Sequence, residues 1–94
     1  MVVPIVHLNG TSEEGLTAPM ETAYAALSNA YDKMKQCAPN GRDYYPLAEG
    51  MLQLATGEHF ARLKKIHALM NELEQLIGYI RERKCGIVAS PWEE

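Results

Sequence analysis

The sequence of 94 residues has few aromatic side chains, only two cysteines and no long apolar run. Aromatic residues make up 7% of the chain, so a core must be built from Leu, Ile, Met, Val and Ala, a mixture that favours helix over sheet. No segment approaches the roughly 20 apolar residues that span a bilayer, and the N-terminus lacks the basic segment of a signal peptide. These absences predict a soluble protein of the cytoplasm without membrane contact.

Basic residues are also too few for a protein that coats nucleic acid. The formal net charge is −3, whereas nonspecific nucleic-acid binding relies on many Lys and Arg contacts to phosphate. We therefore expect no nucleic-acid partner, while local clusters of Arg and Lys leave the binding of a small anion open. Cys37 and Cys85 each lie near a predicted helix end with no metal-ligating neighbour, which indicates free thiols. No metal or cofactor is predicted.

The composition, 47% hydrophobic and 22% charged, predicts one folded domain over residues 1–94. Thr11 and Glu14 have the spacing of a capping box, which starts a helix, and Pro19 either kinks this helix or lies in the first turn of one that begins near Thr17. Gly50 and Gly57 predict a break in the second helix near 50–57. The predicted segments are an extended arm over 1–10, a helix over 12–38, a non-helical loop over 39–46, a helix over 47–85 and a tail over 86–94.

Apolar residues recur at steps of three and four along both predicted helices, which is typical of helices that pack along one another. In the first helix they are Leu16, Met20, Ala23, Leu27, Ala30, Met34 and Cys37, and in the second Leu63, Ile66, Met70, Leu73, Ile77 and Ile80. The pattern predicts an all-α fold, a long antiparallel helical hairpin. Further apolar residues beside these seams, such as Tyr24, Tyr31, Leu69 and Leu76, exceed what one partner helix can bury, so we expect assembly into a homo-oligomeric helical bundle.

The sequence contains none of the catalytic motifs that can be tested by spacing, such as GxSxG, HExxH or a phosphate-binding glycine loop, which favours a binding protein over an enzyme. His59 and His67 are rotated too far apart around a helix to chelate one metal. His59 falls in register with the seam. It is either a core histidine hydrogen-bonded to a neighbour or a residue that faces a ligand.

Two short polar motifs are the candidates for ligand binding. Around Asn9, Thr11 and Ser12, backbone N–H groups and hydroxyls converge at a helix N-terminus, where anions bind; alternatively, Thr11 and Ser12 only cap the helix. In the second motif Arg42 suits a phosphate, Tyr44 or Tyr45 suits stacking on a base, and Asp43 can accept a hydrogen bond. Alternatively this loop is locked, with Arg42 paired to Asp43 or to a helix carboxylate.

The motifs mark opposite ends of the first helix, about 35–40 Å apart at helical rise. An antiparallel dimer would reunite them, or a kink at Pro19 would fold the arm back and bring His7 and Thr11 near the second helix. The predicted ligand-binding residues are His7, Asn9, Thr11, Ser12, Arg42, Asp43, Tyr44, Tyr45, His59 and Arg62.

The segments His7–Ser12 (HLNGTS) and Pro39–Tyr45 (PNGRDYY), each followed by a helix, resemble those of small proteins encoded by tailed phages and prophages. By analogy with phage sponges of immune signals, this resemblance implies a homo-oligomer that sequesters an anionic nucleotide messenger, of the cyclic dinucleotide or cyclic ADP-ribose class, without turnover. Such a protein would inhibit the anti-phage defence of its bacterial host. Two alternatives stay open: a helical adaptor or inhibitor that docks through its apolar flank, and an enzyme that cleaves such a nucleotide with His59 or His7 as general acid or base.

Overall fold

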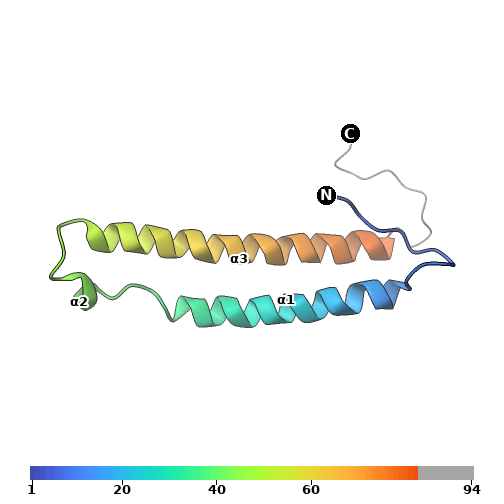
Figure 1. The fold of residues 1–94 in the computed structure, drawn as a ribbon, viewed down its shortest axis with the longest axis horizontal. Coiled ribbons are helices and arrows are strands. Elements are labelled where there is room, and N and C mark those ends of the chain that lie inside the picture. The colour runs from blue at the N-terminus through green and yellow to red at the C-terminus, as the bar shows by residue number, and fades with distance from the viewer. Residues whose placement is uncertain (83–94) are drawn as a thin grey trace.

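The structure, a computed structural model, describes residues 1–82 and contains three helices: α1 (Glu13–Lys35), α2 (Gly41–Tyr44) and α3 (Met51–Glu82). The two long helices lie side by side and antiparallel, with α2 in the connection between them (Figure 1). The predicted all-α antiparallel hairpin is thus confirmed, and residues 1–82 contain no strand. Neither long helix combines, within this range, the length and apolarity needed to cross a bilayer.

Helix α1 begins one residue later than predicted and ends three residues earlier. Its N-cap is Ser12, whose Oγ accepts a hydrogen bond of 3.0 Å from the Gly15 backbone N–H, so the predicted capping box of Thr11 and Glu14 is wrong. The helix assignment continues through Pro19, although a proline in a helix interior removes one backbone hydrogen bond and its ring crowds the carbonyl oxygen four residues earlier. It ends at Lys35, after which the N–H groups of Gln36, Cys37 and Ala38 each donate to the carbonyl three residues earlier. The helix cannot resume beyond this turn, because Ala38 precedes Pro39 and a residue before proline disfavours the helical conformation.

The connection is not the non-helical loop predicted over 39–46. It spans residues 36–50 and includes the one-turn helix α2. Asn40 starts this turn, because its Oδ1 accepts a hydrogen bond of 2.9 Å from the Arg42 backbone N–H and its carbonyl oxygen accepts one of 3.0 Å from the N–H of Asp43. A helix of one turn is too short to show a repeat of apolar residues, so the sequence pattern did not predict α2.

Helix α3 begins at Met51 rather than at Leu47, because Gly50 adopts a φ of 88°, which an L side chain rarely adopts. Of the two glycines at which the sequence indicated a break, Gly50 therefore does interrupt the helical pattern, whereas α3 continues unbroken through Gly57. The packing of its apolar face outweighs the low helix propensity of one glycine. The predicted helix end at 85 and the tail over 86–94 lie outside the described residues.

The core is a single seam between α1 and α3. On α3 the predicted seam is confirmed: Leu63, Met70, Ile77 and Ile80 are buried, and His59 is buried in register with them. On α1 the seam is shifted by one residue. It consists of Thr17, Met20, Tyr24, Leu27, Tyr31 and Met34, all buried or half-buried, whereas the predicted members Ala23, Ala30 and Cys37 are exposed. The two tyrosines cover more of α3 than alanines at these positions would.

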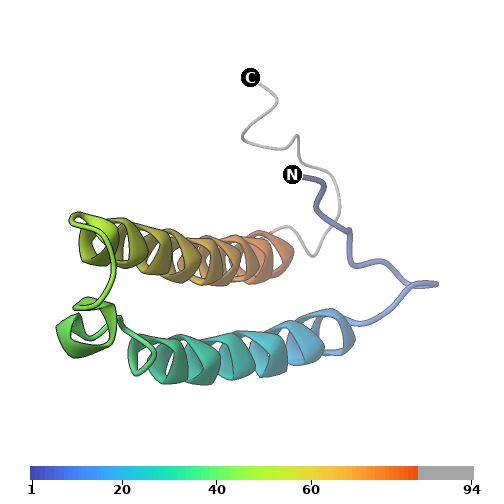
Figure 2. The same cartoon turned by 60° about the vertical axis from the view of Figure 1, so that its left-hand side comes forward.

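The N-terminal arm has no regular secondary structure over residues 1–7 and joins α1 through a turn, in which the Gly10 N–H donates to the His7 carbonyl at 3.1 Å. Both views show the arm running back toward the C-terminal end of α3 (Figures 1 and 2). Val3, Pro4 and Val6 are half-buried, and Ile80 at that end of α3 has no exposed surface. The arm therefore contributes to the core at this end of the hairpin.

Candidate functional site

Three contacts across the hairpin fix the register of α1 and α3. The Arg81 guanidinium lies 2.6 Å from the Glu21 carboxylate, and the Tyr24 hydroxyl donates to Glu74 at 3.4 Å. The rings of Tyr31 and His67 are 6.0 Å apart between centroids. Position 24 is therefore level with 74, and position 31 with 67. The residues of these contacts border one face of the hairpin, the polar face: Glu21, Tyr24, Tyr31, His67, Glu74 and Arg81.

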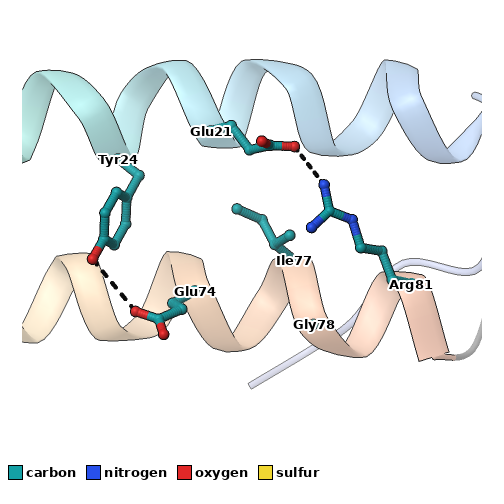
Figure 3. Close-up of a pocket in the computed structure, with 6 residues that line it drawn as sticks. All are labelled: Glu21, Tyr24, Glu74, Ile77, Gly78 and Arg81. Carbon is teal, nitrogen blue, oxygen red and sulfur yellow. Dashed lines mark hydrogen bonds and ion pairs between the residues drawn. The ribbon is translucent and has the colours of Figure 1, made fainter.

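Between two of these contacts the polar face is hollowed into an open groove of about 620 Å³ (Figure 3). The Glu21–Arg81 ion pair closes one end of the groove and the Tyr24–Glu74 hydrogen bond the other, with Ile77 between them (Figure 3). Because Arg81 is already paired with a carboxylate, the groove has no unpaired cation among the lining residues that the structure describes.

A second hollow of about 460 Å³ lies farther along the polar face, lined by Tyr31, Phe60, Leu63, Lys64, His67, Ala68 and Asn71. The Lys35 ammonium lies 5.2 Å from the centre of the Tyr31 ring, in cation–π range, and also 3.3 Å from the Asp32 carboxylate. Both contacts lie within α1 at the exposed surface, so neither of them links α1 to α3. Nothing in the hollow indicates a buried polar anchor for a ligand.

The opposite face of the hairpin carries an apolar stripe on both helices, flanked on α3 by the exposed Lys65 and Glu72, and we call it the apolar face. On α3, Leu69, Leu73 and Leu76 repeat at steps of four and three on the side of the seam away from His67 and Glu74. On α1, Ala23, Ala26 and Ala30 repeat at the same steps on the side away from Glu21. The alanines are exposed and Leu69 is 50% exposed. This surface results from the one-residue shift of the α1 seam, which places two predicted core alanines outside the core.

The residues of the first predicted motif lie at the end of the molecule where α1 begins. His7, Asn9, Thr11 and Ser12 are all exposed. The alternative that serine caps the helix is confirmed, since the Ser12 hydroxyl holds the Gly15 N–H. The His7 ring lies so close to Gly10 that a Cβ atom there would be 2.5 Å from its Nε2.

The second motif lies at the other end of the rod, on α2 (Figure 1). Arg42, Asp43 and Tyr45 are exposed and Tyr44 is half-buried. The predicted lock, with Arg42 paired to Asp43 or to a helix carboxylate, is absent among residues 1–82. The two tyrosines border a small hollow of about 190 Å³ between α2 and the start of α3.

The remaining predicted residues, His59 and Arg62, are on α3. Arg62 is exposed, whereas His59 is only 5% exposed in the seam. The expected hydrogen bond to a neighbour is missing there: within the described chain the His59 Nε2 is buried without a partner. The ten predicted residues are therefore not brought together in one chain. The arm changes direction at the turn after His7, before α1 begins, and His7 and Thr11 are both exposed.

Sequence reasoning missed the cross-helix pairs Glu21–Arg81 and Tyr24–Glu74, because their pairing depends on the register between two helices and no local motif marks it. Among residues 1–82 no group of three His, Cys, Asp or Glu side chains could hold a metal ion. No family model matches this sequence, and comparison with curated proteins and with solved structures likewise found no significant match.

Proposed function

We propose that this chain is a helical association module, which acts by binding another protein through its apolar face. One observation carries this proposal: the exposed Ala23, Ala26 and Ala30 on α1 and Leu69 on α3, with the half-buried Leu73 and Leu76, form one apolar surface that the hairpin leaves partly uncovered. An apolar patch that spans two packed helices is a typical site of protein–protein contact.

The shape of the hairpin supports this proposal. Two helices alone make a single layer, in which each helix can bury only the side that faces the other. Leu69 remains 50% exposed, and exposed apolar residues of the arm, such as Val2 and Leu8, add to the uncovered surface. A partner that covers the apolar face would give the hairpin the second layer that ordinary domains have.

Site-specific photo-cross-linking tests the proposal. A benzophenone amino acid replaces Leu69 on the apolar face or, as the control, Phe60 on the polar face. The two residues are similarly exposed, Leu69 at 50% and Phe60 at 59%. We expect adducts of discrete mass from position 69 and none from position 60 in cells that carry the protein. The absence of adducts from position 69, or equal adducts from both faces, would contradict the proposal. The adduct mass distinguishes a second copy from a different protein.

A second candidate function is the sequestration of an anionic nucleotide messenger in the host cytoplasm, without turnover. It is favoured by α2, where Arg42 and Asp43 are exposed and, among residues 1–82, have no ion pair, beside the hollow bordered by Tyr44 and Tyr45. This hollow of about 190 Å³ is smaller than the roughly 300–1,000 Å³ of ordinary ligand pockets, so residues of a second copy would have to complete the site.

Titration calorimetry against cyclic dinucleotides and cyclic ADP-ribose isomers tests this candidate. Binding heat is expected with at least one of them, and Arg42→Ala should abolish it while the helical circular dichroism signal stays unchanged. Arg81→Ala is the matched control, because it removes an arginine at the opposite end of the hairpin and should leave binding intact. No heat with any of these nucleotides would rule the candidate out.

A further inference from the structure

We infer that the occupant of the apolar face is a second copy of this chain, related by a two-fold axis that runs parallel to the helices, so that α1 of each copy packs on α3 of the other. This inference rests on the proposed function and names its partner. It is carried by the sizes and levels of the side chains on the apolar face.

The two helices present side chains of opposite size on this face. The α1 side is small, with Ala23 and Ala30 seven residues apart, and the α3 side is large, with Leu69 and Leu76 also seven residues apart. Helices pack closely where large side chains of one fit over small side chains of the other. Packing α1 on a partner's α1 would oppose alanines with alanines at a short spacing between the helices, and α3 on α3 would oppose leucines with leucines at a wide one, so the two pairs would not fit one interface.

The alanines of α1 and the leucines of α3 also lie at matching levels along the axis of the hairpin. Because Tyr24 is level with Glu74 and Tyr31 with His67, Ala23 is level with Leu76 and Ala30 with Leu69, to within about one residue of helical rise. A rotation about an axis parallel to the helices leaves every level unchanged. It therefore places Ala30 opposite the partner's Leu69 and Ala23 opposite the partner's Leu76, and the two-fold axis repeats both contacts.

The side of the hairpin that carries the apolar face is large enough for a stable dimer, in which the interface extends beyond the named alanines and leucines along the whole of α1. The 23 residues of α1 extend about 34 Å, and two adjacent helices of roughly 10 Å each give a face about 20 Å wide. This footprint of about 700 Å² per copy, or about 1,400 Å² for the pair, falls within the roughly 1,200–2,000 Å² of specific interfaces. The dimer would be a four-helix bundle with two layers, which buries the leucines of both copies.

We call the dimer whose two-fold axis is parallel to the helices the axial dimer. In this arrangement the α2 helices of both copies lie at the same end of the bundle, so two copies of Arg42 and Tyr45 are found there. The residues around Thr11 and Ser12 gather at the other end. The antiparallel dimer that would reunite the two motifs needs a two-fold axis perpendicular to the helices, which opposes alanines with alanines.

Disulfide trapping in the purified full chain distinguishes these arrangements. Cys37 and Cys85 are first replaced by serine, and Ala30→Cys and Leu69→Cys chains are then mixed in equal amounts and oxidised. The axial dimer predicts a mixed disulfide at several times the yield of either homodimeric product, because only this pair meets the short Cα–Cα distance that a disulfide requires. The pair Ala23→Cys and Leu76→Cys repeats the test in case one variant fails to fold.

Two further experiments measure the mass of the assembly and the relative orientation of its two copies. Sedimentation of the unmodified chain should give twice the chain mass of 10.5 kDa, and Leu69→Glu should return it to monomer, whereas Leu54→Glu, 61% exposed, should not. Spin labels at Tyr45→Cys in the same Cys37→Ser, Cys85→Ser background should lie close together at one end of the dimer. Homodimeric disulfides in excess, or labels at opposite ends, would overturn the axial arrangement. A monomer in sedimentation would overturn the second copy as partner, while adducts from position 69 in cells would still support the association function.

Discussion

Arg81 on α3 donates a hydrogen bond of 2.6 Å from Nη2 to the Glu21 carboxylate on α1, although the two residues are 60 positions apart in the sequence. Their side chains are 51% and 53% exposed, so water and salt screen the interaction. In a double-mutant cycle with Glu21→Gln and Arg81→Gln, we expect a coupling free energy of about 0.2–1 kcal/mol that decreases at high salt.

Urea unfolding at constant chain concentration measures this coupling. A coupling free energy above about 2 kcal/mol, unchanged by 1 M salt, would contradict the prediction and indicate a pair shielded from solvent.

Two glycines of the second half of the chain should respond to alanine in opposite directions. Gly50 has a φ of 88°, so Gly50→Ala should lower the free energy of unfolding by about 1–2 kcal/mol. Gly57 lies within α3, where an added Cβ meets no atom within 4 Å, so Gly57→Ala should raise it by about 0.5–1 kcal/mol. Thermal and urea unfolding of both variants check the signs. Destabilisation by Gly57→Ala would show that α3 is broken at this position.

The N-cap of α1 can be identified by comparing two neighbouring hydroxyls. Ser12→Ala should cost about 0.5–2 kcal/mol of stability, because the Gly15 N–H then loses its acceptor. Thr11→Ala is the matched control and should change stability by less than about 0.5 kcal/mol, since it removes no cap. Urea unfolding measures both. A larger loss for Thr11→Ala would indicate that the helix begins one residue earlier, with the capping box that the sequence suggests.

His59 is expected to lower the stability of the fold. Its Nε2 is buried without a partner among residues 1–82, so His59→Leu should raise the free energy of unfolding by about 1–2 kcal/mol. His67→Leu is the control on the exposed surface and should change it by less than about 0.5 kcal/mol. Unfolding by urea at fixed chain concentration gives both values. Destabilisation by His59→Leu would show that the imidazole has a partner in the assembled protein.

Several features of the fold could be predicted because their causes are local. The steps of three and four on α3 predicted six seam residues, of which Leu63, Met70, Ile77 and Ile80 are buried and Ile66 and Leu73 half-buried. The positions of helix ends were less predictable. Asn40 caps a single turn and Gly50 adopts a positive φ, and both depend on backbone geometry that residue type alone leaves open.

The apolar face could not be predicted either, and the reason is a different one. Two registers fit α1 equally well by periodicity: both include Met20, Leu27 and Met34, and they differ in whether Ala23 and Ala30 or Tyr24 and Tyr31 fill the positions between. The sequence pattern of α1 by itself favours neither. Their energies differ only through what α3 places opposite, such as Glu74 and His67.

Local spacing and helix-breaking residues alone determined that the chain forms two long amphipathic helices with a connection between them, because side chains three and four positions apart share a face whatever lies opposite. The tertiary structure decided which way α1 is rotated about its axis. That rotation buries tyrosines and exposes alanines because the larger rings bury more area against α3, and it thereby created the apolar face on which the proposed association depends.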